Sequence, residues 1–210
     1  MKVSFYFDPC CPFCWITSRW LLMVSGERDV QVDWRPFSLA LKNDEVRGGH
    51  DKTEHGDMHR AAHRVLRVML AAQQKGASLI DLYTDFGIPY HLGGEAYDDA
   101  LITKILAKHD LPPVLARAAD DTGYDDALQK SIDTATAIAG DDIGVPTIIF
   151  TNQDGSKNGF FGPVLQQLPD RDEAVKLWDG LSRLASDKNF YELKRSRPSG
   201  DPDVYSTAKC

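Results

Sequence analysis

The chain has 210 residues, of which 42% are hydrophobic, 26% charged and 10% aromatic, an ordinary composition for a globular protein. Its formal net charge of −7, with no basic stripe, argues against a nucleic-acid partner, and no apolar run approaches the ~18 residues of a membrane span. The N-terminal segment MKVSFYFDP is too short and too soon interrupted by Asp8-Pro9 to be a secretory signal. We therefore expect a cytoplasmic protein with mostly reduced thiols and no membrane partner. The composition does not indicate an oligomeric state.

The first 37 residues predict a strand–helix–strand unit. Lys2–Phe7 is rich in β-branched and aromatic residues and is bounded by Asp-Pro, which favours a strand. From Pro12 to about Ser25 the apolar residues recur at helical spacing, and Gly26 provides a stop. Val30–Phe37 predicts the second strand. A parallel pairing with a right-handed crossover is favoured for such a unit.

The middle of the chain is predicted to be helical, from about Asp57 to Ala139. A polar, Gly-rich loop at Lys42–Gly56 precedes it. Breaks that contain Gly or Pro separate the helical candidates, which are His59–Gln74, Ala77–Phe86, Ala96–His109, Pro113–Ala119 and Tyr124–Ala139.

The last third returns to strands. Thr147–Thr151 predicts a short strand, Asn152–Lys157 a turn with Asp-Gly, Gly159–Phe161 a returning strand, and Asp172–Ala185 an amphipathic helix. The order β-α-β, helices, β-β-α indicates an α/β thioredoxin-like fold with a large all-helical insertion domain. We expect the thioredoxin-like domain at 1–41 and 140–195, the insertion at 42–139, and a mobile, Pro-broken tail at 196–210.

Three of the four cysteines lie in FDPCCPFCW, residues 7–15. Only Cys11 and Cys14 have the C-x-x-C spacing, and Pro12 suits the first turn of the predicted helix. A sulfur at a helix N-terminus faces unpaired N–H groups and the positive end of the helix dipole, which stabilise a thiolate. Cys14 follows close enough to attack a mixed disulfide on Cys11. The sequence therefore predicts Cys11 as the catalytic nucleophile and Cys14 as the catalytic resolving thiol.

Other roles for the cysteines are weaker. A structural zinc site needs a second pair of ligands at matched spacing, and the only other cysteine is Cys210, so we expect no metal. An inert buried pair is the remaining alternative for Cys11 and Cys14. Cys10 is interpreted as a small packing residue, with a modulating role under oxidation as the alternative. Cys210 is interpreted as a bystander rather than a third redox partner.

Five segments together resemble one family: FDPCCPFCWITSRW, VDWRPFSLA, DIGVPTIIF, FFGPVL and FYELKR. They are similar to DsbA-like thioredoxin-fold oxidoreductases, and within these to the actinobacterial branch of mycothiol-dependent reductases or nitroreductases. The resemblance covers nearly the whole chain. It implies a nucleophilic first cysteine, a cis-proline, no tightly bound cofactor, and turnover by a low-molecular-weight thiol such as mycothiol.

The resemblance carries over to Cys11, Cys14 and Pro146. A cis-proline at Pro146 would lie beside the cysteines, and the preceding Val145 would offer backbone hydrogen bonds to an extended substrate. Pro12, Phe13 and Trp15 complete the expected substrate-binding or supporting set. Relatives often carry Trp or His at the Phe13 position, so the redox potential cannot be transferred. Cys10 is not part of the family pattern.

Several other side chains have open interpretations. Asp8 either accepts the proton of Cys14 or is a turn residue favoured before Pro9. Trp15 and Trp20 are expected to be mainly core residues. His55, His59 and His63 recur every four residues along one face of a predicted helix, beside its apolar stripe. Arg60, Arg64 and Arg67 are expected to point away from that stripe. These histidines could bind a metal, face the substrate groove, or be solvated or core-edge residues.

The first functional hypothesis is a cytoplasmic thiol–disulfide oxidoreductase that works mainly as a reductant. Its partners would be a small thiol reductant and a disulfide or electrophilic small-molecule substrate. The second hypothesis is a thiol-dependent transferase or isomerase, as in the related kappa-type transferases and chromene-carboxylate isomerases, in which a two-cysteine motif is unnecessary. The third is a non-catalytic binding protein with idle cysteines.

Overall fold

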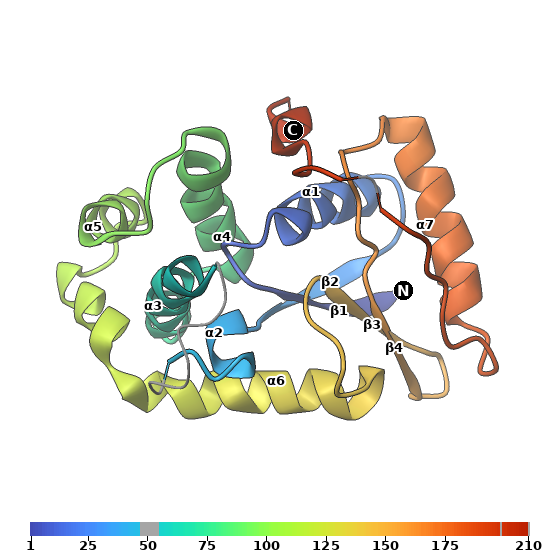
Figure 1. The fold of residues 1–210 in the computed structure, drawn as a ribbon, viewed down its shortest axis with the longest axis horizontal. Coiled ribbons are helices and arrows are strands. Elements are labelled where there is room, and N and C mark those ends of the chain that lie inside the picture. The colour runs from blue at the N-terminus through green and yellow to red at the C-terminus, as the bar shows by residue number, and fades with distance from the viewer. Residues whose placement is uncertain (47–54, 198, 210) are drawn as a thin grey trace. The chain divides into compact units, whose positions relative to one another are not determined.

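The computed structural model describes residues 1–46, 55–197 and 199–209 (Figure 1). The predicted order of strands and helices is observed. The elements are β1 (Lys2–Phe7), α1 (Pro12–Ser25), β2 (Gln31–Pro36), α2 (Leu39–Lys42), α3 (Gly56–Gln73), α4 (Leu79–Gly87), the π-helix η1 (Ile88–Leu92), α5 (Asp99–Lys108), the 3-10 helices η2 (Pro113–Asp120) and η3 (Thr122–Tyr124), α6 (Asp125–Ala139), β3 (Thr147–Thr151), β4 (Lys157–Phe161), α7 (Arg171–Ala185) and the 3-10 helix η4 (Val204–Thr207).

Three local features differ from the sequence prediction. The short helix α2 was not predicted, and part of the predicted loop at Lys42–Gly56 lies outside the described residues. The segment predicted as a helix from Pro113 is a 3-10 helix. Helix α4 continues directly into the π-helix η1 instead of ending at Phe86.

The four strands form one sheet in the order β2-β1-β3-β4. Strand β3 is antiparallel to both β1 and β4, with Tyr6 opposite Thr147 and Thr147 opposite Phe161. Because the pairing is antiparallel, β1 and β4 end at the edge of the sheet where β3 begins. Pro146, immediately before β3, therefore lies at the edge from which the cysteine segment leaves β1.

The chain divides into two compact units. The strand unit comprises Met1–Tyr6, Pro12–Arg35 and Thr134–Cys210, and the helical unit comprises Phe7–Cys11 and Pro36–Asp133. The short segment Phe7–Cys11 thus groups with the helices. The domain boundaries expected from the sequence stay a prediction.

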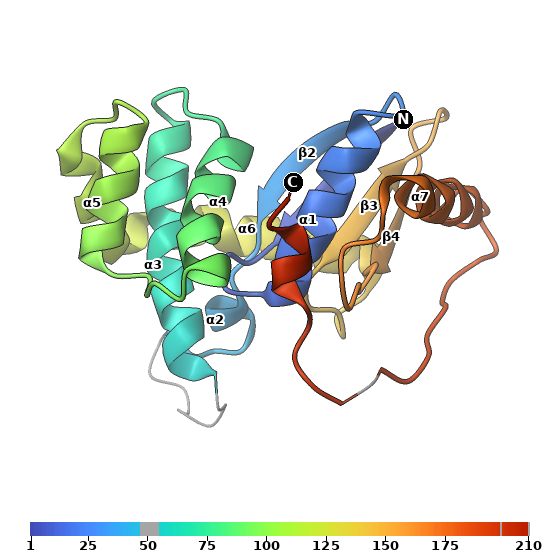
Figure 2. The same ribbon diagram turned by 90° about the horizontal axis from the view of Figure 1, so that it is seen from above.

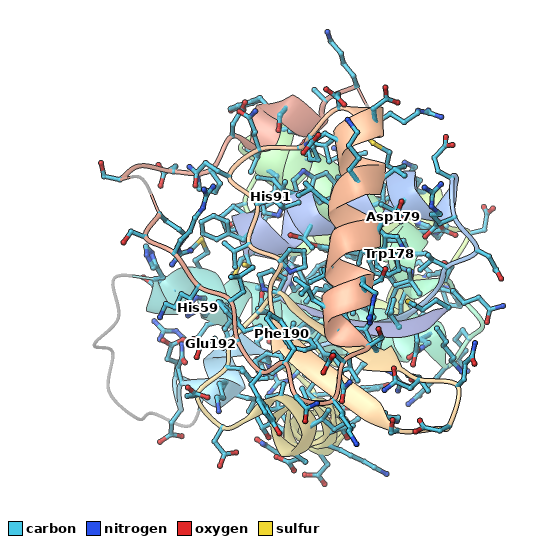
Figure 3. The ribbon with its side chains drawn as sticks, turned by 90° about the vertical axis from the view of Figure 1, so that its right-hand side faces the viewer. His59, His91, Trp178, Asp179, Phe190 and Glu192 are labelled. Atoms are coloured by element: carbon cyan, nitrogen blue, oxygen red, sulfur yellow. The ribbon has the colours of Figure 1, made fainter. Side chains whose placement is uncertain are left out.

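Aromatic side chains build the core of the strand unit. The ring of Trp178 on α7, labelled in Figure 3, lies 5.9 Å from that of Trp20 on α1 and 5.8 Å from that of Phe150 on β3. The Trp20 indole N–H donates to the Ala174 carbonyl at 3.0 Å. Helix α7 is therefore joined to α1 by ring packing and a hydrogen bond, and Trp20 is a core residue as predicted.

Helices α3, α4 and α5 lie side by side in the helical unit (Figure 2). Helix α3 buries an apolar stripe that includes Leu66 and Met69. The carboxylate of Asp98 caps α5 by accepting from the Leu101 N–H at 2.8 Å, a typical helix start.

The C-terminal tail was expected to be mobile, but residues 203–207 have defined contacts. The Ser206 hydroxyl accepts from the Leu168 N–H at 2.9 Å, and the Asp203 N–H donates to the Gln166 carbonyl at 2.8 Å. Thr207 is buried, and its hydroxyl accepts from the Trp15 indole N–H at 2.8 Å. This part of the tail is packed in the strand unit. Cys210 lies outside the described residues.

Candidate active site

The cysteine segment has the strand-to-helix setting that the sequence predicted. Cys11 directly precedes α1, and its backbone N–H donates to the Asp8 carbonyl at 3.1 Å. Pro12 is the first residue of α1 and Cys14 the third. Cys11 keeps 8% exposure, whereas Cys10 has 2% and Cys14 has none. Cys11 is thus the most accessible of the three cysteines.

Two cis-prolines lie at the same edge of the sheet in the strand unit. The peptide bonds Val145-Pro146 and Gly162-Pro163 are both cis. The Gly162 N–H donates to the Pro146 carbonyl at 2.7 Å, and the Pro163 carbonyl accepts from the Thr17 hydroxyl at 2.8 Å. These bonds connect both proline turns to α1, one turn of helix after Cys14. The sequence analysis missed Pro163 and Thr17, although Gly-Pro is a turn signal.

Phe13, between the two cysteines, lines a cleft of about 460 Å³ in the strand unit together with Gln166, Arg197 and Gly200. The Arg197 guanidinium carbon lies 5.0 Å from the centre of the Phe13 ring. This volume falls in the range of small-molecule sites. Phe13 is half-buried, so an aromatic face borders the cleft.

Trp15 lies inside the strand unit and is only 1% exposed. The Arg19 guanidinium stacks over its ring at 4.2 Å, and its indole N–H bonds Thr207. This residue therefore supports α1 from within, which matches the core interpretation.

The segment Phe7–Cys11 packs within the helical unit through several contacts. The Pro9 carbonyl accepts two hydrogen bonds, from His91 Nε2 at 2.8 Å and from the Tyr97 hydroxyl at 3.0 Å. The ring of Phe7 stacks on that of Tyr83 at 4.2 Å. These contacts explain why Phe7–Cys11 groups with the helices. His91 belongs to η1, and π-helices frequently occur at functional sites.

Asp8 has a different partner from the one expected. Its side chain is fully buried, and its Oδ1 accepts from both the Cys10 N–H and the Cys10 thiol at 3.1 Å. Its Oδ2 accepts from the Leu39 N–H at 2.8 Å. Burial raises the pKa of Asp8, although the hydrogen bonds from Leu39 and Cys10 oppose that shift. Burial and the neighbouring Asp8 charge raise the pKa of Cys10 well above its ordinary value.

The histidine series is a set of buried polar contacts. His59, labelled in Figure 3, places Nδ1 2.8 Å from Glu45 Oε2. His63 Nδ1 lies 2.9 Å from the Ser38 hydroxyl, and His63 Nε2 lies 3.1 Å from Asp125 Oδ1. His55 is exposed. Among the described residues no three His, Cys, Asp or Glu side chains are placed to hold a metal ion.

Arg67 was expected to point away from the apolar face of α3, and this was wrong. It is 6% exposed and binds Asp125 through two nitrogens, at 2.7 and 2.8 Å, and the Ala119 carbonyl at 3.0 Å. The bidentate geometry compensates for the loss of water around both charges. The partner comes from α6, 58 positions along the chain, and no local pattern could have indicated it.

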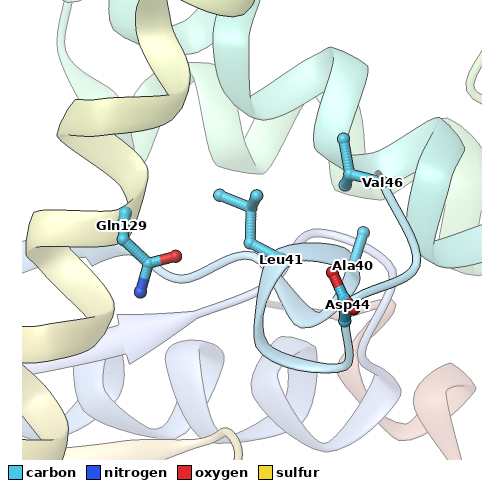
Figure 4. A pocket seen from close by; sticks show the side chains of 5 residues that line it. All are labelled: Ala40, Leu41, Asp44, Val46 and Gln129. Carbon is cyan, nitrogen blue, oxygen red and sulfur yellow. The ribbon is translucent and has the colours of Figure 1, made fainter. Parts of the chain in front are cut away.

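Ser38, His63 and Asp125 follow the order of a hydrolytic triad, but Ser38 cannot act as an external nucleophile. Its side chain is fully buried, and its hydroxyl accepts from the Leu41 N–H as the cap of α2. The pocket in this unit, lined by Ala40, Leu41, Asp44, Val46 and Gln129, measures about 30 Å³ (Figure 4). That volume holds about one or two water molecules and no substrate.

Within the described part of the chain, no helix is long and apolar enough to cross a membrane.

Structural comparisons confirm the predicted fold. A cytosolic disulfide reductase, DsbM, from Pseudomonas aeruginosa aligns with a TM-score of 0.60 at 14% identity, over 88% of this chain and 100% of that one. A probable DsbA oxidoreductase from Streptomyces coelicolor aligns with a TM-score of 0.56 at 16% identity, over 97% of each chain. The chain therefore has a DsbA-like thioredoxin fold with a helical insertion between β2 and β3.

Sequence comparisons show the family. The uncharacterized protein Rv2286c of Mycobacterium tuberculosis is 30% identical over 206 residues, which cover 96% of this chain and 85% of that protein. The model of the Rv2466c-like family, described as mycothiol-dependent nitroreductase Rv2466c, matches residues 10–195. The chain belongs to this Rv2466c-like family of DsbA-like thiol oxidoreductases.

Proposed function

We propose that the protein is a cytoplasmic thiol-dependent reductase in which Cys11 is the nucleophile and Cys14 the resolving thiol. The observation that carries the proposal is the position of the pair: Cys11 directly before the N-terminus of α1 and slightly exposed, and Cys14 buried in its first turn. Mycothiol is the proposed co-substrate, because the family is described as mycothiol-dependent. A structure of the neighbour DsbM with GSH supports a small thiol as partner for this fold.

The proposed reaction begins when the Cys11 thiolate attacks one sulfur of a substrate disulfide. A Cys11 mixed disulfide forms, the substrate S–S bond breaks, and the departing thiolate takes up a proton. Cys14 then loses its proton and attacks the Cys11 sulfur, which forms the Cys11–Cys14 disulfide and releases the second thiol. Two molecules of the small thiol reduce this disulfide and become oxidised themselves.

An electrophilic small molecule can replace the disulfide as electron acceptor. It takes up two electrons and two protons while the Cys11–Cys14 dithiol becomes a disulfide. The cleft beside Phe13 is the proposed site for a planar acceptor, because it combines an aromatic ring with the Arg197 guanidinium. Val145 and Pro146 are proposed to contact an extended substrate, as the family resemblance implies. Pro12 begins α1 and supports the position of Cys11.

Cysteine substitutions test the proposal. Cys11→Ser is expected to abolish reduction of a mycothiol mixed disulfide, whereas Cys14→Ser should accumulate a covalent adduct on Cys11, identified by mass spectrometry of the intact protein and its peptides. Cys10→Ser is the matched control and should turn over. Reduction that persists in Cys11→Ser would overturn the proposal, and isomerase activity that survives in Cys14→Ser would favour a thiol-dependent isomerase.

Substitution of Arg197 tests the proposed acceptor site. Arg197→Ala should raise KM for a planar nitroaromatic acceptor by about two- to fivefold, since a cation over an aromatic face contributes about 0.5–1 kcal/mol at an exposed site. The same variant should reduce a mycothiol disulfide at the wild-type rate. Steady-state kinetics with both substrates measures the difference, and an equal effect on both would place the acceptor elsewhere.

A further inference from the structure

Cys10 is next to the proposed nucleophile, and this arrangement raises a chemical problem. A mixed disulfide on Cys11 is open to attack by any thiolate that reaches its sulfur. If Cys10 were a thiolate it could compete with Cys14 as the resolving group. Some feature of the structure must therefore keep the Cys10 thiol unreactive. The exposed fraction does not distinguish Cys10 from Cys14, because Cys10 is 2% and Cys14 0% exposed.

The contacts of Asp8 distinguish Cys10. One carboxylate oxygen accepts from both the backbone N–H and the thiol of Cys10, each at 3.1 Å, so the thiol proton lies between the sulfur and this oxygen. The other oxygen accepts from the Leu39 N–H at 2.8 Å, which fixes the carboxylate from a second element. The geometry requires Cys10 to be the donor and Asp8 the acceptor.

The neighbouring residue is fixed as well. The Pro9 carbonyl, between Asp8 and Cys10, accepts from His91 and Tyr97 of the helical unit. The backbone on both sides of Cys10 is thus held, because the Cys11 N–H also bonds the Asp8 carbonyl. The Cys10 side chain has little freedom to turn toward the Cys11 sulfur.

The other titratable groups around Asp8 and Cys10 do not offset the negative charge of the Asp8 carboxylate. Burial raises the pKa of Tyr90 and of Tyr97, and the charges of Cys10 and Asp8 raise both further, so these phenols remain neutral. Burial raises the pKa of Asp8, and the hydrogen bonds from Leu39 and Cys10, together with the charge of His59, oppose that shift and stabilise the carboxylate. His91 meets this segment through the Pro9 carbonyl. A second negative charge at Cys10 is therefore disfavoured by its surroundings.

We propose that Asp8 is a positioning residue that holds Cys10 as a protonated thiol and thereby reserves the resolving step for Cys14. This inference rests on the proposed function. The reaction that Asp8 prevents is attack of a Cys10 thiolate on the Cys11 sulfur of a mixed disulfide. In that reaction a Cys10–Cys11 disulfide would form, the bond from Cys11 to the substrate sulfur would break, and the substrate thiolate would leave and take up a proton.

The first test measures alkylation of reduced protein by iodoacetamide, followed for each cysteine peptide by mass spectrometry. Asp8→Asn keeps the shape of the side chain and removes its negative charge. The Cys10 peptide should then be labelled about tenfold faster or more, because lowering the pKa of a thiol by one unit raises its thiolate fraction about tenfold. The Cys11 rate should stay the same. Asp98→Asn, which neutralises the exposed helix-capping carboxylate of α5 in the same unit, is the control for the charge change itself and should change neither rate. Equal Cys10 rates in wild type and Asp8→Asn would overturn the proposal.

Asp8→Asn could fail to fold, so a second measurement keeps Asp8 in place. In Cys11→Ser/Cys14→Ser, the pH dependence of Cys10 alkylation should show a midpoint well above the ordinary thiol pKa. A midpoint at or below about 8.5, the value of a free cysteine, would overturn the proposal.

The last test uses the trapped adduct. In Cys14→Ser the mixed disulfide on Cys11 should persist, whereas in Asp8→Asn/Cys14→Ser it should decay with the appearance of a Cys10–Cys11 disulfide peptide. Adding Cys10→Ser should restore the trap. An adduct that lasts equally long with and without Asp8 would overturn the inference. If Cys14→Ser forms no adduct on Cys11 at all, the proposed function fails, while the alkylation test still decides the role of Asp8.

Discussion

The two compact units bury different kinds of polar groups. Among its described residues, the helical unit buries seven ionisable side chains besides cysteines and tyrosines: Asp8, Glu45, His59, His63, Arg67, His91 and Asp125. The strand unit buries mainly hydroxyl groups, and Arg19 stacks on Trp15. Its ion pairs, such as Arg28 with Asp179, are about half exposed.

This difference shows that the two units are stabilised by different interactions. Buried ion pairs are costly to break because one partner is left charged and without water. An apolar core with neutral hydrogen bonds depends less on any one polar group. We therefore expect the helical unit to be the more sensitive to charge substitution and to pH, and the strand unit to tolerate both.

The distribution of tryptophan allows unfolding of the strand unit to be followed by fluorescence. All four tryptophans, Trp15, Trp20, Trp34 and Trp178, belong to the strand unit. Tryptophan fluorescence therefore reports on the strand unit, whereas far-UV circular dichroism reports on the helices of both units, including α1 and α7 of the strand unit.

Loss of the Asp125 carboxylate should have the largest effect on stability. Asp125→Ala leaves Arg67 buried without its bidentate partner, and removes the charge beside His63. We expect a loss of about 3–5 kcal/mol, typical of one broken buried pair. Urea unfolding followed by circular dichroism measures this loss.

Asp179→Ala is the matched control in the strand unit. It removes a similar bidentate arginine contact, with Arg28, but at an exposed position. Water and salt screen such exposed pairs, so fluorescence-detected unfolding should change little. Equal losses in the two variants would refute the contrast between the units.

The pH dependence of stability should follow His63. Burial and the charge of Arg67 lower the pKa of His63 from 6.5 to about 4, against the opposing effect of Asp125. Between these values the unfolded chain binds the proton and the folded protein does not, so stability falls as the pH drops from 6.5 to 4. The loss from this group reaches about 3 kcal/mol below pH 4.

His63→Gln isolates this contribution, because glutamine can bond Ser38 but does not titrate. Urea unfolding at pH 7, 5.5 and 4.5 should show a flatter pH dependence for the variant than for the wild type. Parallel curves for the two proteins would show that His63 does not cause the acid sensitivity.

The sequence was sufficient for local features and insufficient for contacts across long separations. Alternation in Lys2–Phe7 and the helical spacing after Pro12 located β1 and α1, and their junction identified Cys11. The partner of Arg67 and the donors to the Pro9 carbonyl lie 58, 82 and 88 positions away, where no periodic pattern reaches. The contact of the Asp8 carboxylate with the Cys10 thiol was not predicted from the sequence either.

The packed tail of the strand unit gives a smaller predicted effect than the buried Arg67–Asp125 pair. Thr207→Val removes the acceptor of the Trp15 indole N–H, which lies in a buried setting, so it should cost about 1–2 kcal/mol in fluorescence-detected unfolding. Trp15→Phe removes the donor instead. The Thr207 hydroxyl then still bonds the Val204 carbonyl, so loss of the Trp15–Thr207 hydrogen bond by itself should cost about 1 kcal/mol.

Combining the two substitutions separates this hydrogen bond from packing. If the bond fixes the tail, the double variant should lose less than the sum of the single losses, by about 0.5–1.5 kcal/mol. Limited proteolysis should also cleave after the tail arginines sooner in Thr207→Val than in the wild type. Additive losses of unfolding free energy with unchanged proteolysis would mean that the Gln166 and Leu168 contacts hold residues 203–207 on their own. The Trp15–Thr207 hydrogen bond of the strand unit would then be dispensable.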